Sequence, residues 1–419
     1  MKTAVPTKRQ LAYQDLEFGL FLHFGLRTFH HDNRDFDGKP MSLNAFNPTE
    51  LDCNQWVTTA RQAGMRYAVL TAKHHDGFCN WPTKTTDFSV AGTPWRGGKG
   101  DAIREFTDAC RRQGVTPGIY YSPADAHCPF FKDEKAYDEY FLAHMRELLG
   151  NYGEVGVLWF DGCGSKEHAY DWPRIVGEIR RLQPDVAIFN CGDPDFRWVG
   201  NEGGVAPRPC WNTVTAPPHG SPGMKVVDEE HLDWQPAECD CKLCYGSWFY
   251  HPENELTIKG VEQLMGLYYY SVGRGCNLLL NIGPDRRGLL PEKEARRLLE
   301  FGAEIRRHFG SPFATLKDCT QADDGWEWHA EDWRKPRLID HVVLQEDLTQ
   351  GEHVRRFAVN VWSEHAGHPV AVYEGLNMGH KAICPFPQVS MTKLRVDMLE
   401  ADGPVKLRAL ELHNAAGTR

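Results

Sequence analysis

The sequence has no apolar run of the roughly 18 to 20 residues that a membrane helix needs, and it carries no excess of positive charge. We therefore expect no membrane-spanning role. The formal net charge is −10 and the pI is near 6.0, which argues against a broad phosphate-binding surface and so against a nucleic-acid partner. A neutral ligand fits this charge better.

Signals for export and for disulfide bonds are also lacking. The segment from Met1 to Gln10 has no apolar stretch of the kind found in signal peptides. The 13 cysteines are odd in number and scattered, which favours reduced thiols. Both features predict a cytoplasmic protein. Cys239, Cys241 and Cys244 approach a zinc-binding spacing, but a second Cys-x-x-Cys arm is missing, so ordinary thiols are favoured.

What is present is a regular alternation of strand-like and helix-like segments. Short apolar runs that end in turn residues predict buried parallel strands at 18–25, 67–73, 117–123, 156–162, 186–190 and 277–284. Amphipathic segments predict helices at 56–64, 101–113, 135–151, 173–182, 257–272 and 291–309. No glycine-rich dinucleotide fingerprint follows the first strand. The pattern predicts an α/β fold of the (β/α)8, TIM-like barrel type.

Beyond Ser311 and Pro312 the pattern changes to short strands separated by polar turns. This change predicts a catalytic α/β barrel over residues 1–310 and a small C-terminal β-sandwich over residues 311–419. Packing against the barrel is favoured over sugar binding as the role of the sandwich. The oligomeric state stays open, a homo-oligomer included.

Several of the predicted strands end in residues suited to one pocket. The central candidate is Asp161, which follows Gly156-Val157-Leu158-Trp159-Phe160 and precedes a glycine. An aspartate in this place often only caps a helix or opens a turn. However, His23, the pair His74 and His75, and Tyr121 also stand at strand exits, where a barrel of this type holds its active site.

One acid among histidines and aromatic rings does not suit hydride transfer or phosphate binding. It suits hydrolysis of a glycosidic bond, in which one carboxylate attacks the anomeric carbon and a second acid protonates the leaving oxygen. A metal-dependent hydrolase is one alternative, because His23, His74, His75 and Asp161 are zinc ligand types. Neighbouring histidines on a strand point to opposite faces, however, so His74 and His75 can bind one ion only if the strand has already ended. We expect neither a metal nor another cofactor. A carbohydrate-binding barrel without activity is the other alternative.

Four motifs carry a resemblance to a known family: Leu22-His23-Phe24-Gly25, residues 71–78 with His-His-Asp-Gly-Phe, Trp159-Phe160-Asp161-Gly162 and residues 277–284. Over residues 11–310 the chain resembles the α-L-fucosidases of glycoside hydrolase family 29. The resemblance implies a retaining mechanism with Asp161 as nucleophile. It also implies that the fucose ring is bound by His23, His74, His75, Tyr121 and Trp159.

The same resemblance implies that Glu202 is the second carboxylate. Residues 197–204 resemble the acid/base segment of the subfamily that cleaves α-1,3 and α-1,4 fucosyl branches. Glu202 follows Asp161 by 202 − 161 = 41 residues, one strand further round the barrel. Glu238 is the other candidate for this role. Either glutamate could instead be a surface-loop residue without a role in catalysis. Residues 236–240 and 247–251 also resemble the subfamily, and we expect Glu238, Trp81 and Trp248 to contact the substrate, a fucosylated oligosaccharide or glycoconjugate.

Two segments depart from the family pattern. Residues 30–38 lack the acid and aromatic residues expected after the first strand, so no ring contact is assigned to that loop. Residues 241–245 differ from the subfamily between its acidic and aromatic segments. The departure at 241–245 bears on the linkage that is cut.

Overall fold

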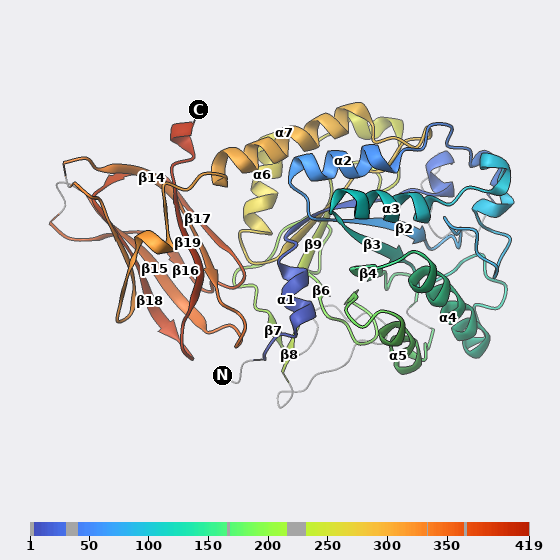
Figure 1. Cartoon of the computed structure of the whole chain (residues 1–419), viewed down its shortest axis with the longest axis horizontal. Coiled ribbons are helices and arrows are strands. Elements are labelled where there is room, and N and C mark those ends of the chain that lie inside the picture. The colour runs from blue at the N-terminus through green and yellow to red at the C-terminus, as the bar shows by residue number, and fades with distance from the viewer. Residues whose placement is uncertain are drawn as a thin grey trace.

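The computed structural model describes residues 4–30, 41–165, 168–215, 232–332, 334–363 and 367–418. It consists of a barrel and a β-sandwich that stand side by side, with α6 (Val261–Tyr270) and α7 (Glu292–Phe309) on the barrel side nearest the sandwich (Figure 1). The predicted loop at 30–38 lies almost wholly outside the described residues.

Eight parallel strands form the barrel sheet in the order β5-β4-β3-β2-β1-β10-β9-β6. A bridge between Phe189 and Phe196 joins the two ends of this order, so the sheet is nearly closed. The predicted barrel fold is thus confirmed. The strands are β1 (Phe18–Leu22), β2 (Tyr67–Lys73), β3 (Thr116–Tyr121), β4 (Val157–Phe160), β5 (Ala187–Phe189), β6 (Arg197–Trp198), β9 (Ala237–Lys242) and β10 (Asn277–Asn281).

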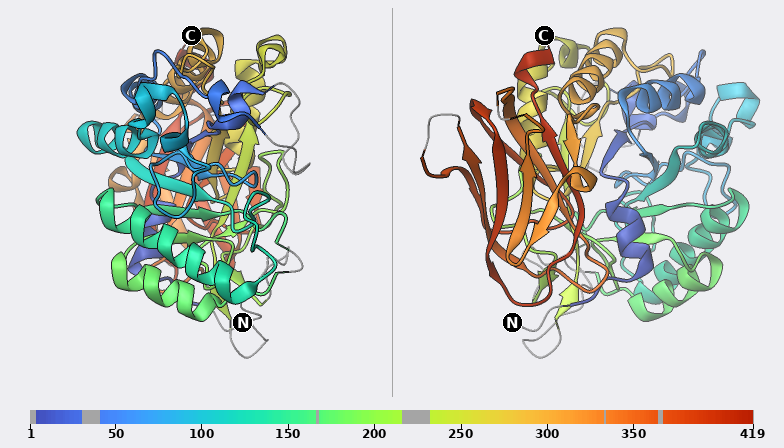
Figure 2. Two further views of the ribbon diagram at one scale, coloured as in Figure 1. Left: turned by 90° about the vertical axis from the view of Figure 1, so that its right-hand side faces the viewer. Right: turned by 60° about the vertical axis from the view of Figure 1, so that its left-hand side comes forward.

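Helices cover the outside of this sheet (Figure 2). Besides α6 and α7 they are α2 (Cys53–Ala63), α3 (Ala102–Gln113), α4 (Glu134–Asn151) and α5 (Trp172–Leu182). These four helices begin alike, since an aspartate at each N-cap accepts a hydrogen bond from a backbone N–H of the first turn. A short helix, α1 (Lys8–Gln14), precedes β1. Between β6 and β9 stands a small hairpin, β7 (Thr213–Val214) with β8 (Asp233–Trp234).

Strand β9 was not predicted, since the sequence pattern indicated no strand between residues 190 and 277. Its sequence alternates in an unusual way: Glu238 and Asp240 lie on the inner face, while Cys239 and Cys241 belong to the outer hydrophobic layer. Burial of acids inside a barrel removes the apolar signal by which buried strands are recognised. These cysteines are free thiols, as the sequence predicted.

Inside the barrel, Glu238 is fully buried at 0% exposure. Its Oε2 accepts hydrogen bonds from the hydroxyls of Tyr13 at 2.5 Å and Tyr67 at 2.7 Å, and its Oε1 accepts one from the Trp159 indole at 2.7 Å. Burial raises the pKa of Glu238, against the effect of the three donors. The prediction that Glu238 contacts substrate, or acts as the second acid, is corrected here: its carboxylate is enclosed by the barrel core.

The C-terminal part is a sandwich of two antiparallel sheets, as predicted (Figure 2). One sheet has the order β11-β19-β14-β17 and the other β12-β13-β18-β15-β16. The strands are β11 (Ala314–Thr315), β12 (Thr320–Ala322), β13 (Gly325–His329), β14 (Arg337–Glu346), β15 (Val354–Trp362), β16 (Val370–Gly375), β17 (Ala382–Met391), β18 (Lys393–Ala401) and β19 (Leu407–His413).

The sandwich is bonded to the barrel. The Tyr269 hydroxyl of α6 lies 2.7 Å from Nε2 of His341 on β14, and the Ile383 N–H donates to the Gly273 carbonyl at 3.1 Å. Lys381 pairs with Glu17, which precedes β1, at 2.5 Å. These contacts, from two segments on each side, hold the sandwich against the barrel wall.

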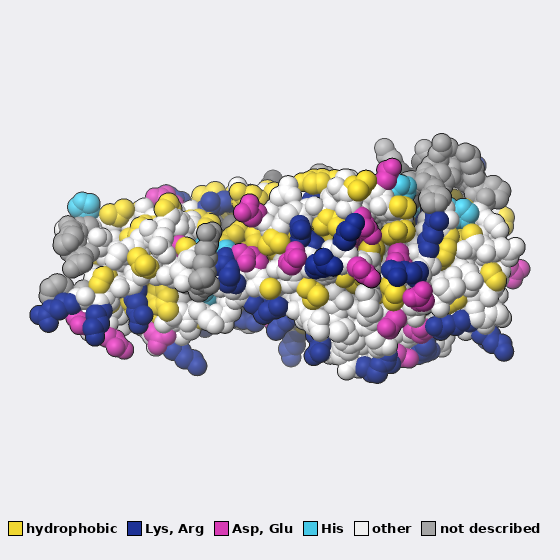
Figure 3. All heavy atoms as spheres, turned by 90° about the horizontal axis from the view of Figure 1, so that it is seen from above, with side chains coloured by type: hydrophobic (Ala, Val, Ile, Leu, Met, Phe, Trp, Pro, Cys, Tyr) yellow, Lys and Arg dark blue, Asp and Glu magenta, His cyan; other side chains and the backbone are white. Residues whose placement is uncertain are grey.

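Among the described residues, every helix is too short or too polar to cross a bilayer. Basic and acidic side chains of the described residues are interspersed over the face shown in Figure 3.

The contribution of the buried Glu238 carboxylate to stability can be tested by substitution. Glu238→Ala should lower the free energy of unfolding by roughly 3–5 kcal/mol, because it leaves buried hydroxyl and indole donors without an acceptor. Glu238→Gln should cost less, since one oxygen remains and a tyrosine hydroxyl can accept from the new amide. Urea denaturation measures both. Two variants within about 1 kcal/mol of the wild type would contradict this account of the core.

Candidate active site

The site is built around the sharp turn that follows β2. His74 and His75 come directly after the last strand residue, and the chain then turns at Gly77, where φ is +84°. A Cβ at Gly77 would lie 2.3 Å from an oxygen of Asp125, so only glycine fits. The turn is fixed further by Asp76, whose Oδ1 accepts the Phe78 N–H at 3.1 Å. Because β2 has ended, both histidines can lie at the end of the barrel where the C-terminal ends of the parallel strands meet. This end is called the barrel mouth below.

His75 is oriented by Ser122. The Ser122 hydroxyl donates to the Ala124 carbonyl at 3.0 Å, so it is left to accept from Nδ1–H of His75 at 2.5 Å. The second ring nitrogen, Nε2, faces Oδ2 of Asp161 at 3.3 Å. Nε2 is therefore the nitrogen of His75 that lies within reach of the Asp161 carboxylate.

Asp161 follows the last residue of β4 and keeps 26% of its side chain exposed. Its Oδ2 accepts a hydrogen bond from the Tyr120 hydroxyl at 2.8 Å, and its Oδ1 accepts one from the Cys163 N–H at 2.9 Å. Burial opposes ionisation, but the bonds from His75, Cys163 and Tyr120 prevail and lower the pKa of Asp161. The carboxylate is therefore ionised at neutral pH and open to the mouth.

His23 is held as a neutral ring. The Asn281 side-chain amide donates to the Trp248 carbonyl at 2.8 Å, so its oxygen accepts from Nδ1–H of His23 at 2.7 Å. Burial lowers the pKa of His23 to about 4. At neutral pH its Nε2 thus carries a lone pair and can accept a hydrogen bond from a hydroxyl group.

Aromatic rings line the rest of the mouth. The His74 ring stacks on Tyr120 at 5.3 Å, and burial lowers the pKa of His74 well below its usual value. The half-buried Trp248 lies 5.0 Å from the ring of His23, and the Lys242 ammonium lies 5.3 Å from the Trp248 ring. Neutral histidines beside aromatic faces suit an uncharged ligand with both hydroxyl groups and C–H surfaces.

Two predicted sugar-binding residues lie elsewhere. Tyr121 points outward from β3, and its hydroxyl bonds Nδ1 of His144 on α4 at 2.8 Å. Trp81 is 1% exposed and donates from its indole to Glu147 on the same helix. The ring that reaches the site from β3 is Tyr120, which the sequence did not single out. Trp159 forms the floor below it, stacked 5.4 Å from Tyr120 and bonded to Glu238.

Glu202 lies on the exposed segment after β6, two strands round the sheet from β4 and not one. The segment is ordered by Asn201, whose side chain accepts the Gly203 N–H at 3.0 Å and donates to the Val205 carbonyl at 2.9 Å. A bridge between Gly203 and Cys241 places Glu202 beside the end of β9. Burial raises the pKa of Asp240 well above its usual value, and the charges of Glu238 and Glu202 act in the same direction.

The cluster of metal-ligand types differs from the one considered in the sequence. Among the described residues, three ligand atoms lie within 4.8 Å of one another in one group, formed by His75, Asp161 and Cys163. His23 is instead engaged by Asn281.

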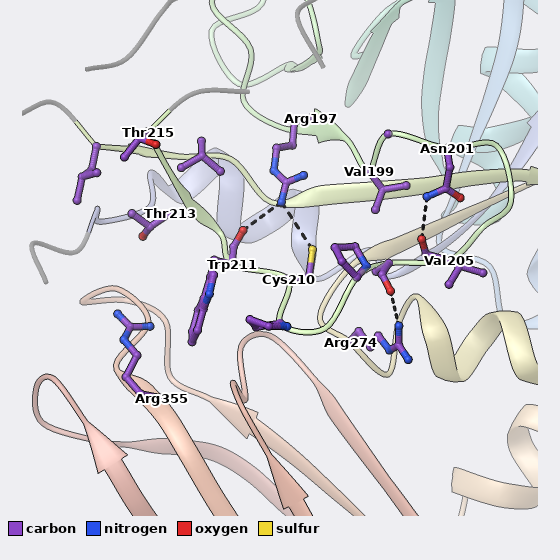
Figure 4. A pocket seen from close by; sticks show the side chains of 16 residues that line it. Arg197, Val199, Asn201, Val205, Cys210, Trp211, Thr213, Thr215, Arg274 and Arg355 are labelled. Carbon is purple, nitrogen blue, oxygen red and sulfur yellow. Dashed lines mark hydrogen bonds between the residues drawn. The ribbon is translucent and has the colours of Figure 1, made fainter. Parts of the chain in front are cut away.

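A cavity of about 970 Å³ lies apart from these residues, on the outer side of β6 and toward the sandwich (Figure 4). Arg197 and Trp211 line it from the barrel and Arg355 from the sandwich. Trp198, between Arg197 and Val199, points the other way and donates to Asp240 inside the barrel. The cavity therefore shares β6 with the barrel mouth but opens on the opposite face of that strand.

The fold and the site together define a barrel glycoside hydrolase: an ionised carboxylate stands at a strand exit among neutral histidines and aromatic rings. Comparison with known proteins specifies the family. The family model described as "Alpha-L-fucosidase" matches residues 29–308. Alpha-L-fucosidase 1 of Arabidopsis thaliana is 33% identical over 99% of this chain and 88% of its own length.

Further matches agree. Plasma alpha-L-fucosidase of Homo sapiens is 26% identical over 70% of this chain and 67% of its own length. The crystal structure of a glycoside hydrolase 29 family member from an unknown rumen bacterium has a TM-score of 0.87 and 32% identity, covering 99% of this chain and 78% of that one. The chain belongs to the α-L-fucosidase family, glycoside hydrolase family 29.

The two neighbouring tyrosines of β3 give a matched pair for testing the site. Tyr120→Phe removes a donor to Asp161, so the pKa of Asp161 should rise and the acid limb of the rate profile should move to higher pH by about one unit. Tyr121→Phe removes only a bond to His144 and should leave that limb in place. Rates of an aryl α-L-fucoside between pH 3 and 8 measure both. An equal displacement in the two variants would argue against the Tyr120–Asp161 bond as its cause.

Proposed function

We propose that this chain hydrolyses α-L-fucosides with retention of anomeric configuration, with Asp161 as nucleophile and Glu202 as general acid and base. The observation that supports this most is the state of Asp161, which is ionised by His75, Cys163 and Tyr120 yet open to the mouth. A fixed anionic oxygen is what attack on an anomeric carbon requires.

The reaction has two steps. In the first, an oxygen of Asp161 bonds to the anomeric carbon while the glycosidic bond breaks and the leaving oxygen takes the proton of Glu202. In the second, the Glu202 carboxylate takes a proton from water, whose oxygen displaces Asp161 and releases fucose. Two inversions at one carbon give net retention.

Neutral side chains would hold the sugar. His23 offers the lone pair of Nε2 to a hydroxyl group, because Asn281 occupies its other nitrogen. Trp248 offers a half-exposed aromatic face to the C–H surface of the ring. Because His23 and His74 stay uncharged, they do not repel the positive charge that develops on the sugar in the transition state.

The choice of Glu202 as the acid rests on its place. It lies on an exposed segment after β6 that is ordered by Asn201 and bridged to the end of β9, while the rival Glu238 is enclosed in the barrel core. Retaining enzymes place the two carboxyl groups about 5–5.5 Å apart, so the Glu202 side chain must turn toward Asp161 over the bound sugar.

We further propose that the preferred substrates carry fucose on α-1,3 or α-1,4 branches. The likeness of residues 197–204, 236–240 and 247–251 to the branch-cleaving subfamily supports this. In the structure, residues 197–204 include β6 and the Glu202 segment, and residues 247–251 include Trp248, so these segments border the mouth where a leaving sugar would lie.

The nucleophile is tested by Asp161→Asn, which should lower turnover at least about 10³-fold with the fold retained, because the amide cannot form the covalent intermediate. The matched control is Asp193→Asn, at an exposed position of the loop after β5, which should keep wild-type rates. Fucose release from an aryl α-L-fucoside and from a branched oligosaccharide is measured, with the first anomer formed read by NMR. An active Asp161→Asn enzyme, or β-fucose as first product, would refute the mechanism.

The acid is tested by the leaving group. Glu202→Ala should slow release from the branched oligosaccharide far more than release from an activated aryl fucoside, because only the sugar leaving group needs protonation. Glu253→Ala, at an exposed position before α6, is the control. Equal losses on both substrates would argue against Glu202 as the acid.

A further inference from the structure

We infer that the mouth of this barrel contains a site for a thiophilic divalent cation, formed by His75, Asp161 and the Cys163 thiol, and that Zn²⁺ bound there inhibits the enzyme. The inhibition rests on the proposed role of Asp161, whereas the binding site does not. The three ligand atoms lie within 4.8 Å of one another. They combine an imidazole nitrogen, a carboxylate oxygen and a thiol sulfur, a set that suits zinc and not magnesium or calcium.

The distance between the first two ligands already fits. Zinc binds nitrogen and oxygen at about 2.0–2.2 Å and sulfur at about 2.3 Å in a tetrahedral arrangement, so neighbouring ligand atoms are about 3.3–3.8 Å apart. Nε2 of His75 lies 3.3 Å from Oδ2 of Asp161. The third ligand, at up to 4.8 Å, must come closer by about 1 Å. Cys163 itself is exposed on the turn that follows β4.

The tautomer of His75 also suits a metal ligand. The Ser122 hydroxyl is committed to the Ala124 carbonyl, so it holds the proton of His75 on Nδ1. Nε2 of His75 is then the nitrogen that faces Oδ2 of Asp161. A hydrogen bond from the far nitrogen to a fixed acceptor is the arrangement that orients histidine ligands of metals. Zinc would take the position of the proton between Nε2 and Oδ2.

Binding has a defined proton balance. The thiol of Cys163 coordinates as thiolate, so its proton passes to the buffer, and a proton on Nε2 of His75 is displaced as well. A water molecule completes the tetrahedron on the open side. With Oδ2 coordinated to the ion and the mouth occupied, Asp161 cannot attack a sugar. The cation is thus an inhibitor that competes with substrate, and the metal-free enzyme is the active form.

The experiment measures binding and activity separately. Chelator-treated wild-type enzyme is titrated with Zn²⁺ by calorimetry in the absence of substrate, and Co²⁺ is used as a second probe because a thiolate ligand gives it a charge-transfer band. The same titrations are done with Cys163→Ser and with Cys319→Ser, which removes a half-buried thiol of the sandwich. We expect one ion per chain in the wild type and in Cys319→Ser, and an affinity at least about tenfold lower in Cys163→Ser.

Binding results decide the site. Equal affinities in the wild type and Cys163→Ser, loss of binding in Cys319→Ser, or no stoichiometric binding would overturn the inference and leave the proposed fucosidase mechanism untouched. Inhibition is then measured on an aryl α-L-fucoside, each variant being compared with its own metal-free rate. We expect Zn²⁺ to raise the apparent KM of the wild type and to act at least about tenfold more weakly on Cys163→Ser.

Two activity results would separate this inference from the proposed function. Stoichiometric, Cys163-dependent Zn²⁺ binding without any effect on hydrolysis would keep the site and refute Asp161 as nucleophile. Activation of the chelator-treated enzyme by Zn²⁺ would overturn the inhibitory role.

Discussion

One buried carboxylate fixes the inside of the barrel. Glu238 on β9 accepts hydrogen bonds from Tyr13 on α1, Tyr67 on β2 and Trp159 on β4. Charge-assisted bonds of this kind are strong in a low-dielectric interior, and the same carboxylate without its donors would be very costly. Elements far apart in the sequence therefore have one arrangement in which all four polar groups are satisfied, and the inner layers of the barrel take their positions from it.

The constraint reaches the active site through aromatic packing. The Trp159 indole, held by Glu238, stacks against Phe189 at 4.1 Å and against Tyr120 at 5.4 Å. Tyr120 in turn supports the His74 ring on its other side and donates to Asp161. Each ring has a packing partner that leaves it little freedom. The donor to the carboxylate is thus positioned before any ligand arrives, which is how a site avoids reorganisation during the reaction.

The sequence was sufficient for the strands that read as apolar runs and for the residues that follow them, so His23, His75 and Asp161 could be placed at one mouth. The sequence did not show which of two neighbouring strand residues faces the inside of the barrel. Tyr120 and Tyr121 are adjacent, and only packing against Trp159 on one side and His144 on the other separates them. It failed also at β9, where inward acids hide a buried strand. Trp81 was misassigned because an aromatic residue on a loop beside β2 can pack behind the barrel as well as over it.

The electrostatics of the mouth follow from unequal burial. Burial keeps His23 and His74 neutral, while the partly open Asp161 gains enough donors to stay ionised. The ionised carboxylate of Asp161 thus lies beside neutral imidazole rings at the mouth. Such a field favours a sugar that becomes positive at its anomeric carbon. A negative charge attracts a small metal cation as it attracts a developing carbocation, and the thiol of Cys163 beside Asp161 would add a ligand for the metal alone. The catalysis and the zinc inhibition that we propose would therefore share one physical cause, the negative charge of Asp161.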